Sequence, residues 1–114
     1  MDPESEIPYL DLYTVQSVMK LGGKKKLDTL IAILNESGPL RLQDLKAAAT
    51  LPAAQSAAKM LKVSAGSLGL ARLEDLCDQI VGCKTWDQAL ELIQEVEQAY
   101  RKGLKALLSH RNEL

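Results

Sequence analysis

The side chains best suited to act both as nucleophiles and as zinc ligands are Cys77, Cys83 and the single histidine, His110. The cysteines stand six residues apart, a spacing that suits neither a CxxC redox pair nor a structural zinc site. His110 lies near the C-terminus, where the negative end of a helix favours a positive side chain. No Ser-His-Asp, Cys-His or paired-carboxylate arrangement can be drawn from the spacing. We therefore expect two ordinary thiols, no metal, no cofactor and no catalytic site.

The elements that position these residues are predicted to be helices throughout. Apolar residues recur at spacings of three and four along almost the whole chain, which is the period of an amphipathic helix. Phenylalanine is absent, alternating β-branched runs are absent, and good helix formers dominate. Short connections between long amphipathic helices favour antiparallel neighbours. We expect an all-α fold, an antiparallel up-down four-helix bundle with a short additional N-terminal helix.

Length and charge limit the classes of function. The chain has 114 residues, 46% of them hydrophobic, which suits one compact domain over 1–114, with 1–8 expected to be a flexible N-terminus. Fourteen basic and fifteen acidic residues give a net charge of -1, so we expect no nucleic-acid partner. No leader pattern and no apolar run of about 20 residues stands out, so we expect a soluble, cytoplasmic protein and no membrane partner.

Turn and cap residues mark the helix boundaries. Asp11 can cap a first helix that stops at Gly22 and Gly23, and a second helix begins in the basic run 24–26. Pro39 either ends this second helix or kinks it, and the turn-like residues 35–39 favour a break. The run 24–26 most simply begins a solvated helix, although it suits contact with an acidic partner as well.

Three more helices follow. Thr50 can cap a helix that ends at Gly69, and the next helix runs from about Ala71 to Gly82 with Cys77 in its apolar stripe, so we expect Cys77 in the core. The last helix opens on residues 85–88, a capping box in which the side chains of Thr85 and Gln88 are expected to bond each other's backbone N–H groups. It is expected to end near His110.

The helix over 50–69 has two distinct sides. Its apolar arc is expected to face the core and contains Ala54, Ala57, Ala58, Leu61, Ser64, Ala65 and Leu68. The opposite stripe is expected to face solvent and contains Gln55, Lys59, Lys62, Val63 and Gly66. Glycine in mid-helix costs roughly 1 kcal/mol against alanine. Gly66 therefore indicates either close packing within the protein or a docking surface that a partner approaches closely.

Residues 58–69 read AKMLKVSAGSLG and are followed by Leu73, Leu76 and Cys77. This pattern resembles the signature of histidine phosphotransfer domains, approximately Ala-His-x-Leu-Lys-Gly-Ser followed by a Leu-rich helix that often carries cysteine. The order of helices is similar over nearly the whole chain. The resemblance implies a helical bundle that exchanges phosphoryl groups with receiver domains, and it implies that the helix at Pro39 is kinked rather than broken.

Two departures from that pattern bear on function. Lys59 stands where the family has its phosphoacceptor histidine, and Val63 stands where the family has a glycine that gives the receiver room, whereas the family's charge-balancing lysine is kept as Lys62. Histidine is largely neutral near pH 7. An exposed lysine has an ordinary pKa near 10.4, so freeing its lone pair at pH 7 costs roughly 4 to 5 kcal/mol. Lys59 is thus expected to be a poor phosphoacceptor, and nothing around His110 resembles the missing motif.

These observations lead to three hypotheses. The first is a pseudo-phosphotransfer protein that docks the receiver domain of a response regulator or hybrid histidine kinase without relaying phosphate, as an adaptor, decoy or inhibitor. Its expected docking residues are Gln55, Lys59, Lys62, Val63 and Gly66. The second is a competent carrier whose histidine was replaced at Lys59, which the additional change at Val63 disfavours. The third is a helical interaction module that no longer binds receivers. A homodimer is compatible with each of them.

Overall fold

The structure is a computed structural model that describes residues 7–114. It contains four α-helices: α1 (Leu12–Ala47), α2 (Leu51–Leu68), α3 (Ala71–Val81) and α4 (Trp86–Asn112). The described residues contain no strand, so the prediction of an all-helical chain is confirmed. The predicted flexible N-terminus falls mainly on residues 1–6, which lie outside the described residues.

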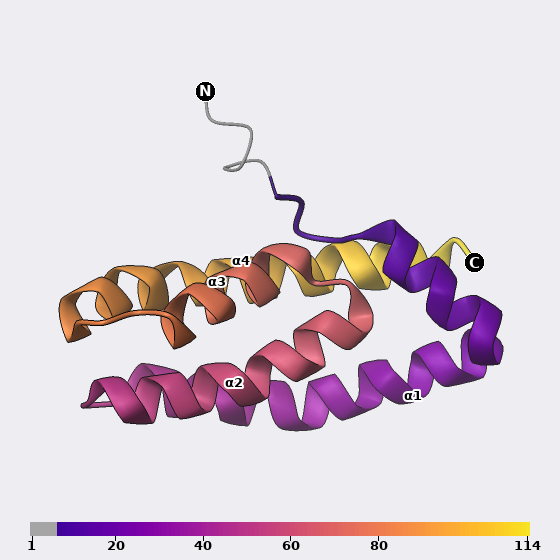
Figure 1. Ribbon diagram of the computed structural model, residues 1–114. Coiled ribbons are helices and arrows are strands. Elements are labelled where there is room, and N and C mark those ends of the chain that lie inside the picture. Colours follow the sequence, from indigo (N-terminus) through magenta and orange to yellow (C-terminus); the bar gives the residue numbers. More distant parts are fainter. Residues whose placement is uncertain (1–6) are drawn as a thin grey trace.

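Helix α1 has two parts that meet at Gly23. The Asp11 side chain caps its start by accepting a hydrogen bond from the Tyr13 N–H at 3.0 Å, as predicted. Gly23 has φ 68° and ψ -165°, a conformation that favours glycine, and the chain changes direction there (Figure 1). The predicted stop at the glycine pair is therefore confirmed.

The predicted break at Pro39 is wrong, because α1 continues through it to Ala47, as the family resemblance implied. Proline removes one helical N–H, which leaves the carbonyl of Asn35 without its usual donor. Asn35 is exposed, so water can satisfy that carbonyl. Leu34 and Leu45 are buried on either side of the proline, and their packing holds the helix together.

The other helices begin and end close to the predicted residues. Thr50 caps α2, Gly69 ends it in the left-handed conformation, and Gly82 ends α3. The capping box predicted for α4 is confirmed in one of its two hydrogen bonds. The Thr85 hydroxyl accepts from the Gln88 N–H, but the Gln88 side chain accepts from the N–H of Lys84 rather than from that of Thr85.

Packing follows the order of the chain. Helix α2 packs on the second part of α1 and on α3, and α3 packs on α4, whereas α1 and α4 touch only sparsely (Figure 1). The core is formed by aliphatic side chains from all four helices and from the turn between α2 and α3. The largest fully buried ones are Leu27, Leu34, Leu45, Leu61, Leu68, Leu70, Leu73, Ile80 and Leu107. Burial of this apolar surface is the main force that holds the helices together.

The segment before α1 fastens the turn between α2 and α3. The Asp11 N–H donates to the Gly69 carbonyl at 2.6 Å, and the Arg72 N–H donates to the Pro8 carbonyl at 3.0 Å. The Arg72 guanidinium also donates to the Ile7 carbonyl and lies 4.4 Å from the centre of the Tyr9 ring. These contacts fix the C-terminal end of α2, the helix that carries the candidate site.

Candidate functional site

Helix α2 turns its predicted core arc inward. Ala54, Ala57, Ala58, Leu61, Ala65 and Leu68 are all buried. Ser64 is the exception, because it is half-buried rather than buried. Since Ala58 and Leu61 point into the core, the helical period places Lys59 on the outer surface, where it is exposed. Lys59 makes no ion pair within residues 7–114.

Val63 stands one turn beyond Lys59 and is 74% exposed. An aliphatic side chain this exposed leaves apolar surface in water. Lys59 and Val63 therefore form a small outward patch that combines a cation with an apolar group.

The remaining three predicted docking residues lie between α2 and α3. Gln55, Lys62 and Gly66 are half-buried, and each is in contact with a side chain or carbonyl of α3 or the residues just after it. The predicted stripe is thus divided: Lys59 and Val63 face outward, while the other three lie along the α2–α3 seam.

Gln55 bonds the end of α3. Its side-chain amide donates to the carbonyls of Val81 and Cys83, both at 3.0 Å, and to that of Ile80 at 3.4 Å. Helix C-termini leave carbonyls without backbone partners, and side-chain donors satisfy them. The Gln55 amide is therefore engaged within the protein.

Replacing Gln55 with alanine is expected to lower the free energy of unfolding by about 1.5 kcal/mol, because the carbonyls of Val81 and Cys83 lose this donor. Chemical denaturation followed by circular dichroism measures this loss. Gln98, exposed on α4, provides the matched control, and its alanine variant is expected to change stability by less than about 0.5 kcal/mol. Equal stability of both variants would contradict the capping role.

Lys62 forms an ion pair across the seam. Its Nζ lies 2.7 Å from Oδ1 of Asp78 on α3, and this hydrogen bond raises the pKa of the Lys62 amine. Because both side chains are partly exposed, the pair adds little to stability. It does direct the Lys62 ammonium toward α3 and away from Lys59.

Gly66 lies beneath the carboxylate of Glu74. A Cβ at this position would overlap the end of the Glu74 side chain, which belongs to α3. Of the two interpretations of Gly66, close approach within the protein accounts for this contact. The carboxylate ends a flexible side chain that can shift, so space for a partner is not required to explain the glycine.

Sequence reasoning missed three members of the outward face. Ser56, Met60 and Ser67 are exposed on the same side of α2 as Lys59 and Val63. We call these five residues the α2 face. The helical period locates the core arc correctly. Centring the exposed stripe directly opposite that arc would have included Ser56, Met60 and Ser67.

The remaining candidate residues lie apart from this face. Cys77 is buried, as predicted, and burial raises the pKa of its thiol to about 12, which keeps the thiol protonated and unreactive. Cys83 is half-buried in the loop before α4 and is also free. His110 is half-buried in the last turn of α4. The described residues contain no group of three or more His, Cys, Asp or Glu side chains able to hold a metal ion.

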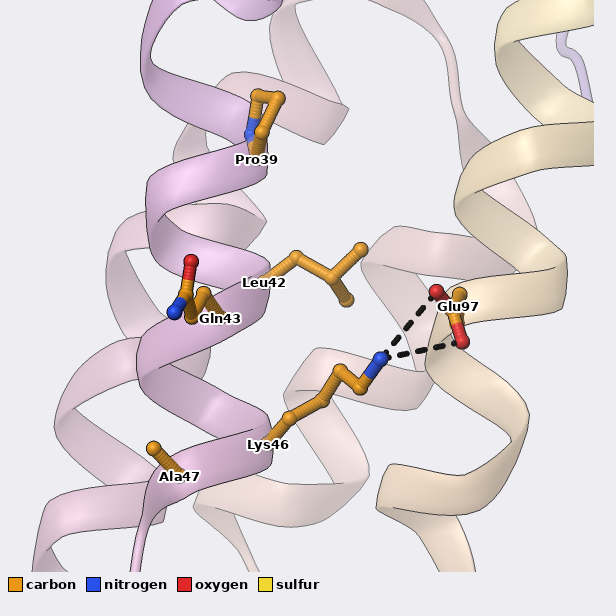
Figure 2. Close-up of a pocket in the computed structure, with 6 residues that line it drawn as sticks. All are labelled: Pro39, Leu42, Gln43, Lys46, Ala47 and Glu97. Atoms are coloured by element: carbon orange, nitrogen blue, oxygen red, sulfur yellow. Dashed lines mark hydrogen bonds and ion pairs between the residues drawn. The ribbon is translucent and has the colours of Figure 1, made fainter.

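A groove of about 470 Å³ lies between α1 and α4, on a side of the molecule that α2 does not line. It is lined by Pro39, Leu42, Gln43, Lys46, Ala47 and Glu97. Figure 2 shows Lys46 reaching across it to Glu97, with 3.3 Å from Nζ to each carboxylate oxygen. This ion pair bridges two helices that otherwise touch little, and the groove offers no nucleophile.

Comparisons with family models, with curated proteins and with solved structures find no match to this chain. None of the helices in residues 7–114 combines the length and the apolar character needed to cross a membrane.

Proposed function

We propose that this protein is a pseudo-phosphotransfer protein of the histidine phosphotransfer type, a cytoplasmic, antiparallel up-down bundle. It docks the receiver domain of a response regulator or hybrid histidine kinase through the α2 face and relays no phosphate. The observation that carries the proposal is the placement of Lys59. It is exposed at mid-helix, with Ala58 and Leu61 buried beneath it. The resemblance aligns Lys59 with the family's acceptor histidine.

The chemistry of the α2 face supports docking without transfer. Lys59 offers an ammonium group with no neighbouring carboxylate partner in the described chain, so it can approach an acidic pocket. Accepting a phosphoryl group would require a free lone pair, which an ammonium lacks. Met60 and Val63 add apolar contact area beside this charge.

The partners that the resemblance implies have acidic active sites. Attraction between such a site and Lys59 favours orientation and encounter rate more than affinity. Val63 limits how closely the two surfaces approach, since its branched side chain stands where the family has glycine. Together these features suit an adaptor or decoy that occupies a receiver.

The test measures binding and transfer separately, with purified receiver domains carrying a radiolabelled phosphoryl group. Binding without transfer of label is expected. Lys59→Glu is expected to weaken binding by about tenfold, because it reverses the charge presented to the acidic pocket. Lys84→Glu makes the same charge change at an exposed position before α4 and serves as the matched control, with affinity unchanged.

Several results would overturn the proposal. Label transferred to the unaltered protein would show a competent carrier. Failure to bind any receiver, or binding that Lys59→Glu and Lys84→Glu affect equally, would favour an interaction module that works through another surface. Lys59→His combined with Val63→Gly is expected to gain more label than Lys59→His alone, whereas full recovery from the single change would indicate a carrier that lost only its histidine.

A further inference from the structure

The end of the molecule where α1 bends is strongly basic. Lys20 lies just before Gly23, and Lys24, Lys25 and Lys26 lie just after it. No acidic residue occurs between Asp11 and Asp28, so the whole of this stretch carries only positive charge. All four lysines are exposed, and none forms an ion pair in the part of the chain that the structure describes.

The C-terminal half of α4 adds to this charge. Residues 98–112 contain four basic residues and no acidic one, although Arg101 is paired with Glu97 and Glu113 follows directly. Arg111 joins the two stretches, because its Nε and Nη2 each lie 2.8 Å from a carboxylate oxygen of Asp28. Asp28, the acidic residue that follows the lysines in the sequence, is thus already paired with Arg111.

Two large apolar side chains project from the same end. Tyr13 is 75% exposed and Leu21 is 77% exposed, whereas Val15 and Val18, which lie between them in the first part of α1, are buried. This part of α1 forms the right-hand end of the molecule beside the end of α4 (Figure 1). We call Tyr13, Leu21 and the four lysines at the bend the basic end.

We propose that the basic end binds the surface of an anionic lipid bilayer. Clustered lysines are attracted to anionic headgroups, while leucine and tyrosine side chains insert at the boundary between headgroups and acyl chains. A nucleic acid would pair with the lysines but would leave Leu21 exposed in water. The combination of four unpaired cations with two projecting apolar side chains therefore favours lipid.

This surface is separate from the α2 face, so the proposal does not depend on receiver docking. It departs from the expectation of no membrane partner, which rested on the absence of an apolar run long enough to cross a bilayer. Peripheral binding needs no such run, because the protein stays on the headgroup side.

The test is co-sedimentation of the full chain with vesicles of phosphatidylcholine, with and without one third phosphatidylglycerol. Binding is expected only to the vesicles that contain phosphatidylglycerol, and it is expected to weaken as salt increases. Each lysine contributes about fivefold to the affinity for an anionic surface. The variant K24Q/K25Q/K26Q is therefore expected to bind these vesicles about a hundredfold more weakly. Leu21→Ser is expected to weaken binding as well, but without changing how binding depends on salt.

Single changes provide the matched control: Lys24→Gln removes one charge at the bend, and Lys84→Gln removes one charge from an exposed lysine elsewhere. Lys84→Gln is expected to bind vesicles as the unaltered protein does, and circular dichroism checks that each variant is folded. Equal losses from Lys24→Gln and Lys84→Gln would overturn the proposal, since they would indicate attraction through net charge alone. Absence of vesicle binding, or preference for RNA or polyglutamate over the anionic vesicles, would overturn it as well.

Discussion

Replacing Gly69 with alanine is expected to lower the free energy of unfolding by about 3 kcal/mol. Gly69 has φ 77°, where side chains are disfavoured, and a Cβ there would lie 2.6 Å from the carbonyl oxygen of Asp11. That neighbour is backbone, so it can move only by displacing the start of α1 and its hydrogen bond from the Asp11 N–H to Gly69. Urea denaturation followed by circular dichroism measures the loss.

Gly82 provides the control for this prediction. It ends α3 with φ -85°, and a Cβ there would lie 3.6 Å from the nearest atom, the carbonyl oxygen of Gln79. Gly82→Ala is therefore expected to change stability by less than about 1 kcal/mol. Similar losses from both variants would mean that the contact with Asp11 is not the cause.

Replacing Gly38 with leucine is also expected to destabilise the fold by about 3 kcal/mol. Gly38 is buried in α1 against the ring of Tyr100 from α4, and a Cβ there would lie 2.9 Å from Cε2 and 3.0 Å from Cζ of that ring. A leucine can fit only if the ring moves and α1 separates from α4. Thermal and chemical denaturation both report this effect.

A double-mutant cycle isolates the contact. In a Tyr100→Ala background the ring is gone, so Gly38→Leu is expected to cost little or to refill part of the cavity. The same penalty in both backgrounds would rule out the ring as the obstacle.

The Tyr100 hydroxyl has a different energetic role from its ring. It is buried without a hydrogen-bond partner within residues 7–114, and burial raises its pKa. A buried hydroxyl without a partner lowers stability, so Tyr100→Phe is the companion variant that leaves stability unchanged or increases it by about 1 kcal/mol.

Local chemistry explains which parts of the fold were predictable. The caps at Asp11, Thr50 and Thr85 and the stops at Gly23 and Gly69 depend on neighbouring residues alone, and each lies where the sequence predicts. The continuity of α1 through Pro39 depends on packing between helices, which residue spacing does not contain. The Gln88 side chain bonds one residue earlier than a standard capping box, a detail of rotamer rather than of pattern.

The predictions for the candidate site are correct where they depend on α2 alone and wrong where they depend on a neighbouring helix. Periodicity predicts correctly that Lys59 is exposed and that Ala58 and Leu61 are buried. It does not show that α3 lies against one edge of the outer stripe, and so it grouped Gln55, Lys62 and Gly66 with Lys59. Ser56, Met60 and Ser67 were missed for a different reason, because the predicted outer stripe was not centred directly opposite the core arc.

The attachments of α2 have a kinetic consequence. The helix is capped at Thr50, bonded to α3 through Gln55 and Lys62, and fixed at Gly69 by the segment before α1. A partner that binds the α2 face therefore contacts a helix whose backbone is already fixed, and little backbone conformational entropy is lost on association. Rigid-body association of this kind needs no slow rearrangement step, so differences in affinity among variants of this surface are expected mainly in the dissociation rate.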